Sequence, residues 1–161
     1  MDENHLTAHI GQYALLKNKE NKLLLLERSR SKTWCLPGGR LHSDEDWDVA
    51  LLREIKEELG LDCVYPKPFG VNILKDDYQT KYCVYFTLNC TDISKLRISD
   101  EHSNLGWFGA EEVKALNIED EKVKELILEY LYTDSAWRAY IERPLAATNG
   151  TNNLDGFARY V

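Results

Sequence analysis

The stretch from Gly39 to Leu61, GRLHSDEDWDVALLREIKEELGL, constrains the fold of this chain more than any other, because a glycine turn leads directly into a helical pattern. Its large apolar residues recur at every fourth position: Trp47, Leu51, Ile55 and Leu59. This spacing is typical of a helix that buries one face. The stretch therefore predicts a helix packed against a core.

The ends of this helix are also marked in the sequence. Ser43 is a candidate N-cap, and the acidic residues that follow it suit the positive end of a helix dipole. Gly60 is typical of the residue that ends a helix, since glycine adopts the left-handed conformation at little cost. We expect the helix to run between these two residues.

A second face of the predicted helix carries Glu54, Glu57 and Glu58, at positions i, i+3 and i+4. Like charges at this spacing repel by a few tenths of a kcal/mol. The helix dipole also disfavours anions in the last turn. A solvated acidic face, neutralised in part by Arg53 and Lys56, is one interpretation. The alternative is a site for a bound cation.

The spacing of the fixed residues decides between these interpretations. Gly39 is followed six residues later by Glu45 and then by Arg53 to Leu61, REIKEELGL. These residues match every position of G-x5-E-x7-R-E-U-x-E-E-x-G-U, where U is a bulky aliphatic residue. Average residue usage gives a chance match on the order of 10⁻⁹ per starting position. The stretch resembles the Nudix box, and the Leu36 to Gly39 approach, LPGG, is also usual in that family.

The resemblance implies the Nudix fold, an α/β/α sandwich around a mixed β-sheet, and periodicity supplies compatible elements. The predicted strands are Ala8–Leu16, Lys22–Glu27, Thr33–Leu36, Cys63–Leu74, Tyr82–Leu88 and Leu105–Phe108, and the later helices are Ala110–Leu116 and Asp120–Tyr140. The first two strands are expected to form a hairpin around a polar turn, and the fourth and fifth a second hairpin. The second strand is apolar on both sides, which favours a central place in a sheet.

Composition bounds the organisation of the chain. Its 161 residues, 43% of them hydrophobic, suit one core. We expect a single domain over residues 1–143 and a mobile C-terminal tail over residues 144–161. No apolar run reaches the roughly 20 residues of a membrane helix, and the first residues lack the features of a signal peptide. The prediction is a cytoplasmic protein with no membrane partner.

Charge and cysteine usage add two further expectations. The net charge of −7 argues against a nucleic-acid partner, because extended phosphate contacts require a basic surface. The four cysteines, Cys35, Cys63, Cys83 and Cys90, show neither CxxC nor zinc-like spacing. We expect them to serve as packing residues without chemistry.

The resemblance implies a metal-dependent pyrophosphohydrolase. Such an enzyme cleaves a nucleoside diphosphate linked to another moiety, such as a nucleoside triphosphate or a dinucleoside polyphosphate, by attack of water on a phosphorus. Mg²⁺ or Mn²⁺ would be the cofactor, since both ions prefer oxygen ligands. By resemblance, Glu57 and Glu58 are the main ligands, and Glu54 is a ligand or part of the proton path.

Other residues of the box receive supporting roles by the same resemblance. The carbonyl of Gly38 is a further metal ligand. Arg53 holds the glutamates in place through charge-assisted hydrogen bonds. Glu45 stabilises the turn and the start of the helix.

Residues outside the box are the candidates for the base and for substrate binding. Glu101 resembles the downstream acid that many Nudix hydrolases use as ligand or base, whereas His102 is expected to be hydrogen-bonded in its loop. Arg28 and Arg30 either meet substrate phosphates or are simply solvated. Tyr78 lies seventeen residues past the box, where a tyrosine resembles the dinucleoside polyphosphate group.

Two alternatives to the enzyme remain open at this point. One is a non-catalytic Nudix domain that binds a nucleotide and regulates a partner, although all the box glutamates are present. The other is an isomerase of the isopentenyl diphosphate type, for which we cannot place the required cysteine and glutamate. The expected partner is a small-molecule nucleotide, and related proteins are often homodimers.

Overall fold

The computed structural model describes residues 7–75 and 79–141, with side chains described as far as residue 133. Two predictions fall outside these ranges. They are the substrate contact assigned to Tyr78 and the mobile tail over residues 144–161.

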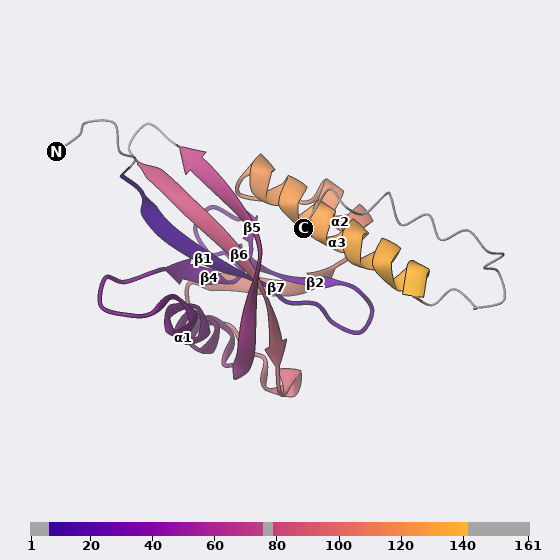
Figure 1. Cartoon of the computed structure of the whole chain (residues 1–161), viewed down its shortest axis with the longest axis horizontal. Helices are drawn as coiled ribbons and strands as arrows, with labels where there is room; N and C mark the ends of the chain where they lie inside the picture. The colour runs from indigo at the N-terminus through magenta and orange to yellow at the C-terminus, as the bar shows by residue number, and fades with distance from the viewer. Residues whose placement is uncertain (1–6, 76–78, 142–161) are drawn as a thin grey trace, which may run out of the picture.

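Among the described residues, seven strands form two sheets, whose arrangement is seen in Figure 1. The first sheet has the order β4-β1-β6-β5, formed by β4 (Gly38–Arg40), β1 (His9–Leu15), β6 (Thr80–Cys90) and β5 (Cys63–Lys75). It is mixed, because β1 runs parallel to β6 while the other neighbours are antiparallel. The second sheet is antiparallel, with the order β3-β2-β7, formed by β3 (Trp34–Cys35), β2 (Leu23–Arg28) and β7 (His102–Phe108).

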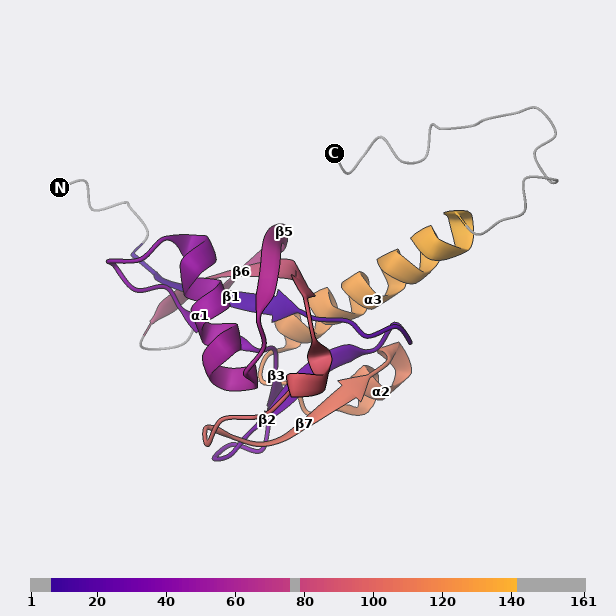
Figure 2. The same cartoon turned by 90° about the horizontal axis from the view of Figure 1, so that it is seen from below.

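Helices cover both sides of the sheets (Figures 1 and 2). Helix α1 (Trp47–Leu59) lies on one side, and α2 (Ala110–Ala115) and α3 (Glu121–Ile141) lie on the other, while a 3₁₀ turn, η1 (Ile93–Lys95), precedes β7. This arrangement is the predicted α/β/α sandwich. Within the described ranges, no helix has the length and apolar character needed to cross a membrane.

Strand alternation divides the core into two clusters. On β2, Leu23 and Leu25 pack on the side of α2 and α3, whereas Leu24 and Leu26 pack on the side of α1. All four leucines are fully buried. The uninterrupted apolar run is therefore explained by a strand covered on both faces, and its predicted central position is confirmed.

The predicted first hairpin is correct only at its base. Leu24 donates its N–H to the carbonyl of Leu16, and Lys17 bridges to Leu23. Beyond this point β1 and β2 enter different sheets, so the two strands do not pair along their length. Each finds its partners elsewhere in the chain, which a local pattern does not reveal.

The second predicted hairpin is confirmed, since β5 and β6 pair from Cys63 opposite Cys90 to Lys75 opposite Thr80. The register shifts near Pro66 and Pro68, and β5 is an edge strand, where the missing N–H of proline is tolerated.

The start of α1 differs from the prediction. Asp46, and not Ser43, is the N-cap, and its side chain makes no capping hydrogen bond. Residues 43–46 instead belong to a turn that Glu45 closes by accepting a hydrogen bond from the His42 N–H at 3.0 Å. The predicted C-terminal end is confirmed, because Gly60 has φ 69° and donates its N–H to the carbonyl of Lys56.

The cysteines require one correction. Cys63 and Cys90 are bonded to each other as a disulfide, although the sequence predicted no chemistry for them. They lie opposite each other at the open end of the β5–β6 pair, a proximity set by strand register and not by sequence spacing. Cys35 and Cys83 are free and buried, consistent with a packing role.

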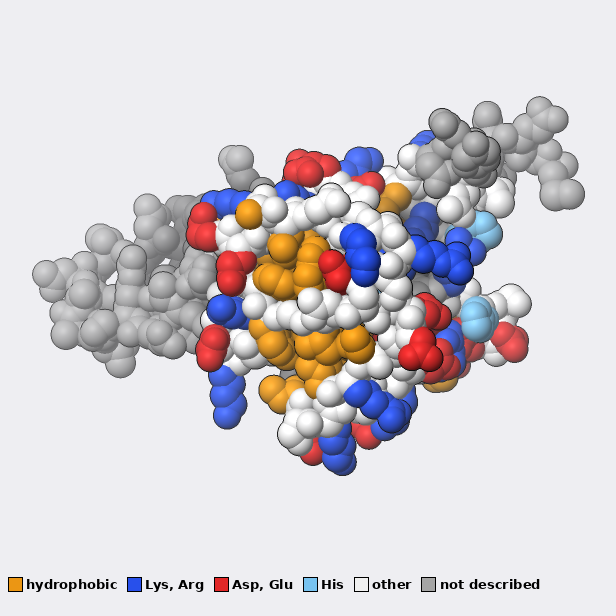
Figure 3. Space-filling view, turned by 180° about the vertical axis from the view of Figure 1, so that it is seen from behind, with side chains coloured by type: hydrophobic (Ala, Val, Ile, Leu, Met, Phe, Trp, Pro, Cys, Tyr) orange, Lys and Arg blue, Asp and Glu red, His pale blue; other side chains and the backbone are white. Residues whose placement is uncertain are grey.

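Surface charge is mixed on the face seen in Figure 3. Hydrophobic side chains gather near the middle of this face, and side chains of both charges lie around them.

Candidate active site

Glu58 anchors the end of α1 to strand β4. Its Oε2 accepts a hydrogen bond of 2.7 Å from the Gly38 N–H, and its side chain is only 10% exposed. Burial raises the pKa of Glu58 to about 8, and the nearby charge of Glu54 adds to this rise, whereas the Gly38 N–H opposes it. The carboxylate is thus held in a place that disfavours its charge in the absence of a cation.

Glu54 lies directly against the first glycine of the box. A Cβ atom on Gly39 would lie 2.4 Å from the Glu54 Cδ and about as close to both carboxylate oxygens. Only a residue without a side chain leaves room for this carboxylate. Glycine is also required at Gly38, where φ is 134° and a Cβ atom would lie 2.1 Å from the carbonyl oxygen of Gln12.

The carbonyl of Gly38 points away from β1. The Pro37 carbonyl accepts a hydrogen bond from the Ala14 N–H, and the Ile10 carbonyl accepts one from the Leu41 N–H. The pair Gln12–Gly39 lies midway between these two pairs, so it is also a hydrogen-bonded pair of the antiparallel ladder. The Gly39 N–H therefore points at β1. The peptide between Gly38 and Gly39 is trans. Its carbonyl therefore points to the side opposite β1. This is also the side on which the Gly38 N–H meets Glu58.

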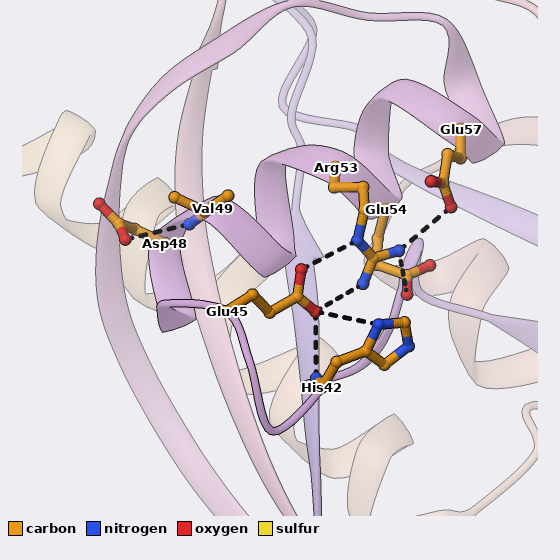
Figure 4. Close-up of polar contacts among 7 residues, drawn as sticks. All are labelled: His42, Glu45, Asp48, Val49, Arg53, Glu54 and Glu57. Carbon is orange, nitrogen blue, oxygen red and sulfur yellow. Dashed lines mark hydrogen bonds and ion pairs between the residues drawn. The ribbon is translucent and has the colours of Figure 1, made fainter.

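Arg53 joins three carboxylates (Figure 4). It binds Glu45 through Nε and Nη2, at 3.0 and 2.8 Å. Its Nη1 donates to Glu54 at 3.0 Å and to Glu57 at 3.1 Å. The hydrogen bonds from Arg53 lower the pKa of Glu45 to about 2. Arg53 therefore contacts Glu54 and Glu57 of the box, and Glu45 is hydrogen-bonded both to Arg53 and to the turn ahead of α1.

The donor groups at this site suit a hard divalent cation. They are three carboxylates and one backbone carbonyl, and Mg²⁺ and Mn²⁺ prefer oxygen ligands. Glu54 and Glu58 lie close enough for the charge of one to raise the pKa of the other, so a cation would relieve their repulsion. Among the described side chains, no three His, Cys, Asp or Glu residues lie close enough together to hold a metal ion in the present arrangement. Arg53 engages Glu54 and Glu57 instead.

His102, the first residue of strand β7, lies beside Glu58, and Glu101 precedes it in the turn before that strand. Glu101 is exposed, and its charge contributes to the raised pKa of Glu58. The His102 ring is buried rather than held in the loop as predicted, and its Nε2 lies 3.8 Å from Glu58 Oε1 and 3.9 Å from the Cys35 sulfur. Burial lowers the pKa of His102, which favours the neutral ring. No local sequence pattern indicates this contact.

Arg28 makes a contact that the sequence did not predict. Its Nε donates to Glu119 at 2.8 Å, and this ion pair raises the pKa of Arg28 against the opposing effect of burial. Glu119 also helps to line a narrow pocket on the α3 side of the sheets, together with Tyr13, Leu36, Leu74, Tyr85 and Val123. Arg30 is exposed in the turn after β2. Because 91 residues separate Arg28 from Glu119, no local pattern could have indicated the pair.

Residues 7–130 match the family model described as the NUDIX domain. This match covers most of the chain, which therefore belongs to the Nudix family, as its box and fold indicate.

Three similar proteins illustrate the relationship. The uncharacterized Nudix hydrolase YvcI of Bacillus subtilis is 30% identical over 101 residues, or 60% of this chain and 64% of that protein. This chain thus spans just under two thirds of the length of YvcI. The nucleoside triphosphatase NudI of Enterobacter sp. is 27% identical, with 54% of this chain and 69% of NudI covered. The crystal structure of a MutT protein from Methanosarcina mazei superimposes with a TM-score of 0.69 at 24% identity, covering 81% of this chain and 99% of that one.

Proposed function

We propose that this protein is a divalent-metal-dependent pyrophosphohydrolase that cleaves a nucleoside diphosphate linked to another moiety. The observation that carries this proposal is the grouping of Glu54 and Glu58 against the glycines of β4, with Arg53 bound to Glu54 and Glu57. A structural helix face would gain nothing from concentrating these charges, whereas a cation site requires them.

The residues that would hold Mg²⁺ or Mn²⁺ are Glu54, Glu57, Glu58 and the carbonyl of Gly38. When bound, the cation would neutralise charge on the diphosphate and lower the pKa of water. Arg53 keeps Glu54 and Glu57 in place through Nη1 and is itself fixed by two hydrogen bonds to Glu45. Arg53 is therefore a positioning residue.

The reaction is hydrolysis of a phosphoric anhydride. A water oxygen forms a bond to one phosphorus while the bond from that phosphorus to the bridging oxygen breaks, and the bridging oxygen leaves with the other product. Glu101 is the proposed acceptor of the water proton, supported by its exposed position and its electrostatic effect on Glu58.

The substrate is a small-molecule nucleotide in this proposal. The relative NudI is named a nucleoside triphosphatase, which supports this class. Arg28 and Arg30, at the end of β2 and in the turn after it, are the proposed phosphate contacts. Because Arg28 is held by Glu119, a bound phosphate would compete with that carboxylate for the guanidinium.

The test is a screen of nucleoside triphosphates, dinucleoside polyphosphates and nucleoside diphosphate sugars, each with Mg²⁺ and with Mn²⁺. Both products of each reaction are identified, so that the cleaved bond is known. We expect metal-dependent turnover that a chelator abolishes. Tight nucleotide binding without turnover of any compound would instead support a regulatory binding module.

A further inference from the structure

Gln12 on strand β1 is a buried polar side chain whose oxygen has no partner. The residue is only 2% exposed, and its Oε1 accepts no hydrogen bond within the described part of the chain. A buried polar group that is left without a hydrogen bond destabilises the folded state. An apolar residue of similar size would avoid this cost, so the amide calls for an explanation other than packing.

Gln12 faces the side of the sheet that α1 covers. Ala14 and Leu16, two and four residues further along the chain, belong to the core cluster on the α1 side, and alternate residues of a strand share a face. In the register of the sheet, Gln12 lies between Gly39 on β4 and Val84 on β6. Its amide therefore lies between β1 and the helix that carries the box glutamates.

The same register places Gln12 beside Glu54. Residues directly opposite each other on neighbouring strands point to the same face, about 5.5 Å apart at Cα in a hydrogen-bonded pair. The space into which a Gly39 side chain would point is occupied by the carboxylate of Glu54. Gln12 is the residue opposite Gly39, so its side chain adjoins that carboxylate on the buried side of the site.

We propose that Gln12 is a positioning residue of the cation site, and that its side-chain oxygen accepts a hydrogen bond from the water of a hydrated divalent cation held at Glu54. This inference rests on the proposed function. Mg²⁺ keeps several of its waters when it binds to protein carboxylates, so the site needs neutral acceptors as well as charged ligands. A glutamine supplies such an acceptor without adding a fourth negative charge to Glu54, Glu57 and Glu58.

The Gln12 amide is expected to lower the stability of the metal-free protein and to raise its affinity for the divalent cation. If Gln12 served only to fill space, Gln12→Met or Gln12→Leu would change neither property for the worse, because both residues have similar volume. If it serves the cation, the same variants lose an acceptor. Mutation of residues that form hydrogen bonds to the ligands of a metal typically lowers metal affinity by a factor of about 10 to 100.

The experiment measures Mn²⁺ binding to the nucleotide-free protein, by calorimetry or by the electron paramagnetic resonance of free Mn²⁺, together with thermal unfolding of the metal-free protein. The variants are Gln12→Met, Gln12→Leu and Gln12→Glu. Ser99→Ala is the matched control, because the Ser99 hydroxyl is another buried oxygen without a partner among the described residues.

We expect Gln12→Met and Gln12→Leu to weaken Mn²⁺ binding about tenfold without lowering the melting temperature. Gln12→Glu, which keeps an oxygen acceptor, should retain Mn²⁺ binding, and Ser99→Ala should bind as the wild type does. Wild-type affinity in both apolar variants would overturn the inference while the proposed function stands. A wild-type protein that binds no Mn²⁺ and hydrolyses no nucleotide would overturn both.

Discussion

Reduction of the disulfide between Cys63 and Cys90 should lower the stability of this protein by several kcal/mol. The bond joins residues separated by 27 positions and thereby closes the β5–β6 pair at its open end. In the chain-entropy model a loop of this length restricts the unfolded state by about 12 cal/mol/K, or about 3.6 kcal/mol at 25 °C. This is a large share of the 5–15 kcal/mol that a typical domain possesses.

The native contacts around the disulfide should survive its reduction. The β5–β6 ladder continues to Lys75 opposite Thr80, and Thr91 still donates its N–H to the carbonyl of Asp62. The effect is therefore expected mainly in the unfolded state, which gains freedom.

The assay is urea unfolding of the oxidised protein, of the protein treated with a phosphine reductant, and of the double variant Cys63→Ser/Cys90→Ser. We expect the reduced protein and the double variant to share a lowered midpoint. The reductant should not affect the double variant further, because Cys35 and Cys83 are free. An unchanged midpoint on reduction, or alkylation of four thiols in the untreated protein, would refute the reasoning.

Three further changes test the site and the core. Gly39→Ala should reduce turnover by about 10- to 100-fold while circular dichroism stays unchanged, because the added Cβ displaces the Glu54 carboxylate 2.4 Å away; wild-type turnover would contradict this. Glu45→Gln should destabilise the protein at pH 7 in urea unfolding. The Glu45 pKa is lowered from 4.5 to about 2, so the ionised carboxylate adds to the free energy of unfolding above pH 4.5. This stabilisation is lost as the pH falls through about 2, where variant and wild type should become equally stable. A stability difference that persists there would contradict this explanation. In the same assay, Ile55→Ala should lower the free energy of unfolding by about 2–5 kcal/mol and Ile55→Val by about 0.5–1.5 kcal/mol, because the Ile55 side chain is fully buried. A change near zero, as at an exposed position, would contradict this packing.

The sequence predicted those features that depend on neighbouring residues. Leu51, Ile55 and Leu59 of the predicted stripe are buried on α1, whereas Trp47 at its start is 46% exposed. Gly60 ends that helix in the left-handed conformation. The box spacing places Glu54, Glu57 and Glu58 on α1, where Arg53 contacts Glu54 and Glu57 and Glu58 is buried against Gly38. Alternation along β6 and the apolar run of β2 predicted strands that the structure contains.

Features that depend on the pairing of distant segments were missed. The Cys63–Cys90 bond, the Arg28–Glu119 ion pair and the burial of His102 beside Glu58 all follow from sheet topology. The failure at Ser43 has another cause, because Glu45 is engaged by Arg53 and by the His42 N–H, and this turn delays the start of the helix to Trp47. Local capping preference was overridden by a tertiary ion pair.

The most direct test of the central claim compares hydrolysis by the wild type with hydrolysis by Glu57→Gln and Glu58→Gln, on the best substrate of the nucleotide screen with saturating Mg²⁺. We predict that either substitution abolishes product formation while the fold is retained, because each removes a proposed cation ligand, and a glutamine at position 58 keeps an oxygen that accepts the Gly38 N–H. Unfolding monitored by circular dichroism provides the control for the fold. Turnover at the wild-type rate in either variant would contradict the assignment of the reaction to these glutamates.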